Sequence, residues 1–195
     1  MKCDIILSGV GGQGVLSLAG LIGYGAIAEG LHAKQSEVHG MAQRGGAVQA
    51  HLRLADRPIH SDLIPRGAAD MILSMEPLES LRYLDYLSPA GTLVTATNPF
   101  VNIPDYPALE GVLARIRELP HAILVDAESL AREAGEVQAM NTVMVGAASH
   151  LLPLKPETLE KVVRQVFGPM GERMVEVNLA AFRAGRKAGE TVGAR

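Results

Sequence analysis

The spacing of apolar positions near the N-terminus changes at a glycine-rich segment. Residues 5–10 form a mostly apolar run typical of a strand covered on both faces, whereas residues 15–22 resume with helical spacing. Between them, Gly9, Gly11 and Gly14 match the pattern G-x-G-x-x-G, which combines a tight turn, close approach of a ligand to the backbone, and helix–strand packing. We therefore predict a strand, a sharp turn and a helix whose first N–H groups and dipole favour an anion. The same pattern also fits a turn that binds no nucleotide.

The remaining apolar patterns predict alternating strands and helices followed by a helical end. Strands are expected at residues 32–38, 47–54, 69–74, 92–97 and 122–126. Helices are expected at residues 15–30, 77–87, 108–119, 128–134, 141–152, 156–167 and 172–188. The proline-rich residues 98–107 are expected to form an extended loop over the surface.

Two connections decide the expected sheet. The first strand, the first helix and the strand at residues 32–38 have the length of a right-handed crossover unit. The turn-forming residues 56–58 predict that the strand at residues 47–54 folds back into residues 59–61 as an antiparallel hairpin. We therefore expect an α/β fold with an open, mostly parallel, Rossmann-like sheet, an antiparallel hairpin, helices on both faces and a helical C-terminal end.

Length and charge narrow the class of protein. A chain of 195 residues that is 48% hydrophobic can form one substantial core but not two full-sized domains. We expect a single domain over residues 1–188 and a disordered tail over residues 189–195. The net charge of −3 and the scattered basic residues argue against nucleic acid and an anionic membrane as partners. No apolar segment is long enough to span a bilayer, so we expect a cytoplasmic protein.

The sequence offers little catalytic chemistry. Cys3 is the only cysteine, so the chain alone can form neither a disulfide nor a four-cysteine iron–sulfur or zinc site. The six histidines lack metal-ligand spacing, and we expect no metal site. There is no nucleophile elbow, no lysine-containing phosphate loop and no convincing pair of carboxylates, so we assign no catalytic residue. A binding or assembly subunit fits this composition better than a free-standing enzyme.

A second glycine-rich segment, residues 37–46, is too polar for a core helix and predicts a functional loop. His39, Gln43 and Arg44 offer a titratable group, an amide and a cationic fork, and the segment ends in a glycine doublet that can adopt positive φ. Such a loop could bind a carboxylate, a phosphate or a partner's backbone. It could equally be a solvated loop without a partner.

Several segments across nearly the whole chain carry a family resemblance. They are Gly9-Val10-Gly11-Gly12-Gln13-Gly14, His39-Gly40-Met41-Ala42-Gln43-Arg44-Gly45-Gly46, Leu63-Ile64-Pro65, Ala69-Asp70 and Glu76-Pro77-Leu78-Glu79. With them, the chain resembles the gamma-type domain of the 2-oxoacid:ferredoxin oxidoreductases. The Arg-Gly-Gly and Gly-Gly-Gln-Gly motifs mark the wider family, and the His-Gly-Met-x-Gln-Arg variant points to its indolepyruvate branch.

The resemblance implies a required subunit that has no catalytic side chain and is inactive by itself. In such enzymes a 2-oxoacid and coenzyme A give an acyl-CoA and carbon dioxide while electrons pass to ferredoxin, and thiamine diphosphate and the iron–sulfur clusters belong to the large partner subunit. We expect the two glycine-rich segments to form one crevice at the carboxyl ends of adjacent strands, facing that partner or admitting coenzyme A. The candidate binding residues are Gly9, Gly11, Gly12, Gln13, Gly14, His39, Gln43, Arg44, Gly45 and Gly46.

Two other functions fit the same residues. The chain could be a stand-alone Rossmann-type oxidoreductase that binds a nicotinamide or flavin dinucleotide, with Glu37 on a ribose hydroxyl. It could also be a homo-oligomeric scaffold that uses the glycine turn only structurally, and an isolated heteromeric subunit could itself form a homodimer. The sequence leaves the choice of 2-oxoacid open between arylpyruvates, pyruvate and branched-chain oxoacids.

Overall fold

The computed structural model describes residues 1–39 and 45–193, which form a six-stranded sheet in the order β2-β3-β1-β4-β5-β6. The strands are β1 (Lys2–Val10), β2 (His32–His39), β3 (Ala47–Ala55), β4 (Ala69–Ser74), β5 (Leu87–Ala96) and β6 (Ala122–Val125). Strands β1, β4, β5 and β6 are parallel neighbours, whereas β3 runs antiparallel to both β1 and β2. The expected open and mostly parallel α/β sheet is confirmed.

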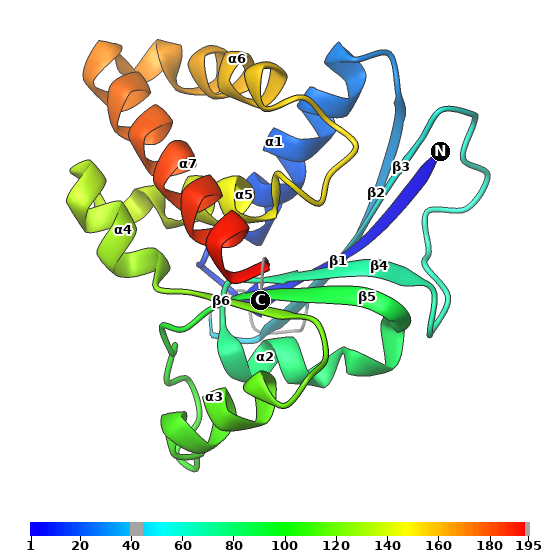
Figure 1. Cartoon of the computed structure of the whole chain (residues 1–195), viewed down its shortest axis with the longest axis vertical. Helices are drawn as coiled ribbons and strands as arrows, with labels where there is room; N and C mark the ends of the chain where they lie inside the picture. Colours follow the sequence, from blue (N-terminus) through cyan, green and yellow to red (C-terminus); the bar gives the residue numbers. More distant parts are fainter. Residues whose placement is uncertain (40–44, 194–195) are drawn as a thin grey trace.

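Helices cover both faces of this sheet (Figure 1). The larger layer contains α1 (Val15–Ala28), α4 (Ala127–Ala134), α5 (Met140–Ala148), α6 (Pro156–Phe167) and α7 (Glu172–Gly193). The other face carries α2 (Pro77–Arg82) and α3 (Leu109–Arg117). Short 3-10 helices follow α2, precede α5 and follow α6, at Leu84–Tyr86 (η1), Val137–Ala139 (η2) and Gly168–Met170 (η3). Among the described residues, none of the helices is both long enough and apolar enough to cross a membrane.

Strand β1 is apolar at successive positions because both of its faces are covered. Ile5 and Leu7 point into the core beneath the larger helical layer, and Ile6 points into the core beneath α2 and α3. All three side chains are completely buried. An apolar run without alternation is what a strand between two helical layers requires, since alternate side chains enter different cores.

Strand β3, expected to pair with residues 59–61 in an antiparallel hairpin, pairs with other strands. Strand β3 pairs with β2 on one side and β1 on the other, and residues 59–61 form no strand. Side chains of β3 hold the following segment instead. The Arg53 guanidinium donates to the carbonyl oxygens of Ser61 at 2.9 Å and Leu63 at 3.1 Å, and His51 Nδ1 accepts from the Ile64 N–H at 3.0 Å. The prediction of a return strand at residues 59–61 was therefore wrong.

The order of the strands shows that the expected crossover unit does not join neighbouring strands. Strand β2 runs parallel to β1, but β3 lies between them, so α1 connects two strands that are not neighbours. In register, Glu37 is opposite Ala50, which is in turn opposite Leu7. Glu37 is thus two strands away from β1, at about twice the 4.8 Å strand spacing.

Three element boundaries differ from the expectation by five residues. Helix α2 ends at Arg82, and β5 begins at Leu87 and passes through the predicted turn at Pro89. Proline is tolerated there because β6 pairs only with the Leu93–Ala96 half of β5, which leaves the first half at an open edge. Helix α7 continues to Gly193, through residues expected to form a tail, because it remains packed on α5: a β-carbon on Gly189 would lie 2.2 Å from the Ala147 carbonyl oxygen.

Candidate functional site

The glycine turn after β1 begins α1 without a side-chain cap. Gly14 is the N-cap residue of the helix and has φ of 75° and ψ of 36°, a left-handed conformation that costs other residues about 1–2 kcal/mol. Its carbonyl oxygen accepts hydrogen bonds from the Ser17 N–H at 2.9 Å and from Asn141 Nδ2 at 3.3 Å. A β-carbon on Gly14 would lie 2.4 Å from that Asn141 nitrogen. The backbone conformation therefore requires glycine at this position, and a larger residue would also displace the Asn141 amide.

Gln13 fixes the turn to the neighbouring strand. Its side-chain Oε1 accepts from the Val10 N–H at 2.8 Å, and its Nε2 donates to the Met75 carbonyl at 3.3 Å. Val10 ends β1 and Met75 directly follows β4. The amide of Gln13 thus links the carboxyl ends of two parallel strands, which explains why an amide is needed within the glycine-rich segment.

The structure brings the two glycine-rich segments together. The Gly11 N–H donates to the Gly46 carbonyl at 2.8 Å, and the Gly45 N–H donates to the Gly11 carbonyl at 3.2 Å. The Gly45 carbonyl also accepts from Asn102 Nδ2 at 2.7 Å. The turn after β1, the start of β3 and the loop after β5 therefore meet at the carboxyl edge of the sheet.

The loop after β5 is held by Glu76, a residue outside the two glycine-rich segments. Glu76 is buried and caps α2 by accepting from the Glu79 N–H at 2.7 Å. Its other carboxylate oxygen accepts from the Tyr106 hydroxyl and from the Phe100 N–H. One buried carboxylate thus fixes both the start of α2 and the loop at residues 98–107, and through Asn102 it supports the contact with Gly45.

Burial controls the ionisation of the groups around Glu76. Burial and the hydrogen bond to the Glu76 carboxylate raise the pKa of the Tyr106 phenol above its usual range, so this hydroxyl remains a donor at neutral pH. Burial also raises the pKa of Glu79, although Arg82 opposes this shift through a 3.0 Å ion pair. These residues position the loop, and none of them lines the crevice or the apolar cavity described below.

Beside the glycine turn lies a crevice of about 470 Å³ at the carboxyl edge. It is lined by Gly12, Gln13, Gly14, Met75, Val137, Gln138, Met140 and Asn141. None of these described residues has an ionisable side chain. The crevice can therefore bind a ligand through amides and backbone groups, but the lining residues themselves cannot act as a general acid or base.

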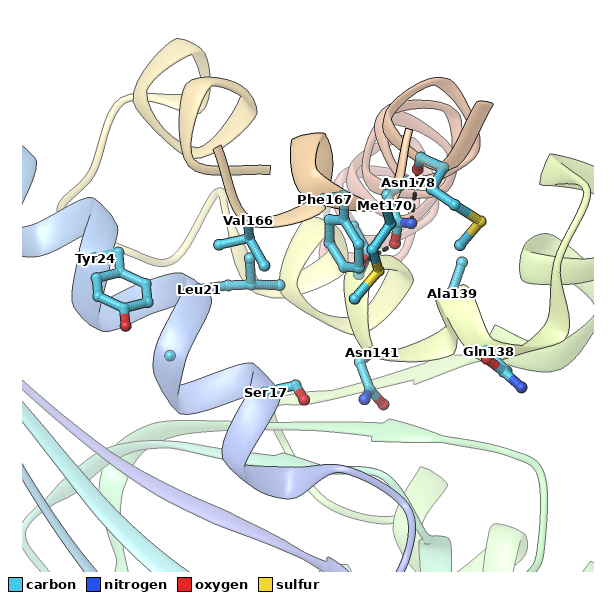
Figure 2. Close-up of a pocket in the computed structure, with 13 residues that line it drawn as sticks. Ser17, Leu21, Tyr24, Gln138, Ala139, Asn141, Val166, Phe167, Met170 and Asn178 are labelled. Atoms are coloured by element: carbon cyan, nitrogen blue, oxygen red, sulfur yellow. Dashed lines mark hydrogen bonds between the residues drawn. The ribbon is translucent and has the colours of Figure 1, made fainter. Parts of the chain in front are cut away.

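An apolar cavity of about 340 Å³ adjoins this crevice and shares Gln138 and Asn141 with it (Figure 2). Leu21 of α1 faces Val166 and Phe167 at the end of α6, and Met170 follows in η3. Its buried polar pair is satisfied internally, since the Thr142 hydroxyl donates to Asn178 Oδ1 at 2.7 Å and Asn178 Nδ2 donates to the Met174 carbonyl at 2.9 Å. Thr142 and Asn178 therefore use part of their hydrogen-bonding capacity within the protein, and only the rest is available to a ligand.

The structure places the predicted site residues in different surroundings. Gly11, Gly45 and Gly46 are in direct contact, and Gly12, Gln13 and Gly14 line the crevice. Gly9 lies within β1 and has a packing role, because a β-carbon there would be 2.9 Å from Val15 Cγ2. His39 ends β2 opposite Val48. Gln43 and Arg44 lie outside the described residues, so their part in the site remains a prediction.

The structure weighs against the dinucleotide alternative. In a dinucleotide-binding fold the acid for the ribose ends the strand next to the glycine turn. Here β3 occupies that place, and Glu37 lies one strand further out.

Within residues 1–39 and 45–193, no three histidine, cysteine or carboxylate side chains converge in a way that could hold a metal ion. Cys3 is buried, and burial raises the pKa of its thiol to about 12, so it is a poor thiolate ligand.

Comparison with known proteins connects this geometry to a family. The family model described as pyruvate ferredoxin/flavodoxin oxidoreductase matches residues 4–188. The chain is 38% identical to the indolepyruvate oxidoreductase subunit IorB of Pyrococcus horikoshii over 195 residues, with 95% of each chain covered.

Two solved structures share the fold. The gamma subunit of a keto/oxoacid ferredoxin oxidoreductase from Geobacter sulfurreducens superposes with a TM-score of 0.72 at 26% identity, and 98% of each chain is covered. The 2-oxoglutarate:ferredoxin oxidoreductase of Magnetococcus marinus gives a TM-score of 0.78 at 21% identity, and it was solved with 2-oxoglutarate, coenzyme A and succinyl-CoA bound. That match covers 97% of this chain but only 31% of the Magnetococcus chain.

Proposed function

The chain belongs to the pyruvate ferredoxin/flavodoxin oxidoreductase family, and we propose on that basis that it is a subunit of a 2-oxoacid:ferredoxin oxidoreductase. The complex would oxidise a 2-oxoacid with coenzyme A to an acyl-CoA and carbon dioxide, with ferredoxin as the electron acceptor. Residues 1–188 would form one gamma-type domain of this enzyme, working in the cytoplasm. The observation that carries the proposal is identity to an IorB subunit along nearly the whole chain.

The proposed role of this chain is structural support of the reaction and not the chemistry itself. Thiamine diphosphate and the iron–sulfur clusters would belong to a large partner subunit. The described residues support this division, since the crevice at the glycine turn is lined by glycines, amides and apolar side chains and by no ionisable one. Gly12 to Gly14 would face the partner's reaction centre or a coenzyme A phosphate, which suits an uncapped helix N-terminus.

For the substrate, we propose indolepyruvate or a related arylpyruvate. This choice rests on the relative from Pyrococcus horikoshii, whose name specifies indolepyruvate. No described residue of the crevice selects an aryl group, so selection would belong to the partner subunit.

The test is an anaerobic pull-down of the tagged chain from its native cell, with thiamine diphosphate and iron assayed in the eluate. Recovery of a large cofactor-bearing subunit, followed by indolepyruvate-dependent reduction of ferredoxin by the complex, is expected. A chain recovered without any such subunit contradicts the proposal.

The purified complex then allows a test of Arg44. Arg44→Ala is expected to raise the apparent KM for coenzyme A or to weaken assembly, because a guanidinium binds phosphate bidentately. Unchanged assembly and an unchanged KM would remove Arg44 from the proposed site.

A further inference from the structure

Helix α1 has no charged side chain along its 14 residues, yet it is not enclosed by the protein. Its inner face is buried in the core through residues such as Leu18 and Ile22. Its outer face leaves Leu16, Tyr24 and Ile27 exposed, at 46%, 60% and 63% respectively. A helix that is apolar all round is normally buried all round, so this face lacks a covering surface among residues 1–39 and 45–193.

Two glycines on the same face also lack a packing reason within the part of the chain that the structure describes. A β-carbon on Gly20 or Gly23 would meet no neighbouring atom within 4 Å. By contrast, a β-carbon on Gly25, on the inner face, would lie 2.8 Å from the Leu159 side chain. Each glycine in a helix costs about 1 kcal/mol relative to alanine. The outer glycines form a shallow notch between the exposed Leu16 and Ile27, suited to the close approach of another backbone.

Grooves flank this helix on both sides. On one side is the apolar cavity of Figure 2, whose outer wall contains Val166, Phe167 and Met170, the last 64% exposed. On the other side a groove of about 260 Å³ runs between α1 and β2, past Ala33 and Lys34. A partner side chain could therefore enter the surface on either side of α1.

This apolar surface is continuous with the glycine turn. Gln138 and Asn141 line both the apolar cavity and the crevice at the carboxyl edge. Helix α1 itself begins at Gly14, inside that crevice. Whatever covers the outer face of α1 therefore comes to lie over the mouth of the candidate site.

We propose that the outer face of α1, with the adjoining segment 166–170, is the docking surface for the large oxidoreductase subunit. The inference rests on the proposed function, which makes this chain a subunit of a larger complex. The partner surface would be apolar and uncharged where it meets α1, because α1 offers no charge to pair with a buried ion. An apolar partner side chain fills the cavity between α1 and Phe167, and a partner backbone crosses the notch at Gly20 and Gly23.

The position of this face beside the candidate site favours the large subunit as its partner, because that subunit would carry the reaction centre. Docking along α1 covers the uncapped helix N-terminus and the amides of Gln138 and Asn141, which are the only polar side chains shared by the two hollows among the described residues. The crevice then faces the partner and is shielded from water, where helix-terminal N–H groups act most strongly on an anion.

The experiment compares two charge insertions in the full-length chain. Ile27→Lys places an ammonium group on the outer face near the C-terminus of α1, where a positive charge suits the helix dipole. Leu63→Lys is the matched control, because Leu63 is similarly exposed at 55% but lies in the connection between β3 and β4, at the amino edge of the sheet. Circular dichroism melts establish that both variants are folded, and affinity for the purified large subunit is measured anaerobically.

We expect Ile27→Lys to weaken binding of the large subunit about 100-fold or more, because the ammonium group would be buried without a partner, and Leu63→Lys to bind as the wild type does. Equal binding by both variants overturns the docking surface while leaving the proposed function intact. A wild-type chain that captures no thiamine-bearing subunit contradicts the proposed function itself.

Light scattering on the isolated chain tests the other possible occupant of this face, which is a second copy of the chain. A wild-type homodimer that Ile27→Lys dissociates, with binding to the large subunit unchanged, would assign the face to a second copy and overturn the inference.

Discussion

Helices α1 and α5 have similar composition but different surroundings. Both are free of charged side chains and mostly apolar. Every residue of α5 from Thr142 to Ala148 is buried, and Figure 1 shows the helix in the middle of the helical layer, whereas α1 lies at the margin beside β2 with its outer face bare. An apolar helix must be enclosed, and only α5 is enclosed by its own chain. The contrast identifies α1 as the place where the fold is completed by another molecule.

The largest effect is expected when the same charge is placed in each helix. Val143 of α5 is completely buried, so Val143→Lys should destabilise the chain by more than about 4 kcal/mol and abolish cooperative unfolding. Ile27→Lys in α1 should change the free energy of unfolding by less than about 0.5 kcal/mol, since the site is exposed. Urea denaturation followed by circular dichroism measures both. A stable Val143→Lys protein would mean that α5 is less enclosed than the structure shows.

The second-largest loss of stability is expected at Gly146, where α5 contacts α7. A β-carbon on Gly146 would lie 2.1 Å from the Phe182 carbonyl oxygen, a backbone atom that cannot move without shifting α7. Gly146→Ala should therefore lower the free energy of unfolding by about 2–3 kcal/mol, even though alanine is the better helix former. Urea denaturation of Gly146→Ala and of the wild type measures this difference in the free energy of unfolding. A neutral or stabilising effect would show that the two helices can separate at little cost.

Local patterns in the sequence predicted the parts of the fold that local chemistry decides. The turn from β1 into α1 was recognisable because glycine spacing specifies it, and the contact of Gly11 with Gly46 agrees with the rule that ligand crevices lie at carboxyl ends of strands. The hairpin was assigned wrongly because the turn residues at 56–58 say nothing about which strand β3 will pair with. That choice depends on long-range pairing with β1 and β2.

The residues that hold the candidate site in place could not be predicted from the sequence either. Asn141 reaches the Gly14 carbonyl from 127 residues away, and nothing around Asn141 distinguishes it from a polar residue on a helix surface. Glu76 belonged to a recognised motif, but its hold on Tyr106 and Phe100 depends on how the loop after β5 folds back. Residues that position other residues over long distances leave no periodic signal.

A smaller effect is expected where the two helices touch at the glycine turn. Gly14→Ala imposes about 1–2 kcal/mol of backbone strain at φ of 75° and displaces the Asn141 amide from its 3.3 Å hydrogen bond. We expect the two contributions together to lower the free energy of unfolding by about 2 kcal/mol in urea denaturation. Asn141→Ala separates the two contributions, because it removes only the hydrogen bond and should cost about 0.5–1.5 kcal/mol. A Gly14→Ala protein as stable as wild type would show that the turn adopts another conformation.

The smallest effect has the opposite sign and tests the notch on α1. A β-carbon on Gly23 meets nothing within 4 Å, so Gly23→Ala should raise the free energy of unfolding of the isolated chain by about 0.5–1 kcal/mol. The same glycine-to-alanine change thus destabilises at Gly146 and stabilises at Gly23, because the space above Gly146 is filled by α7. Paired urea titrations of the two variants measure the difference directly. If Gly23→Ala destabilises the isolated chain, then α1 is already covered there, and the contrast between the two helices fails.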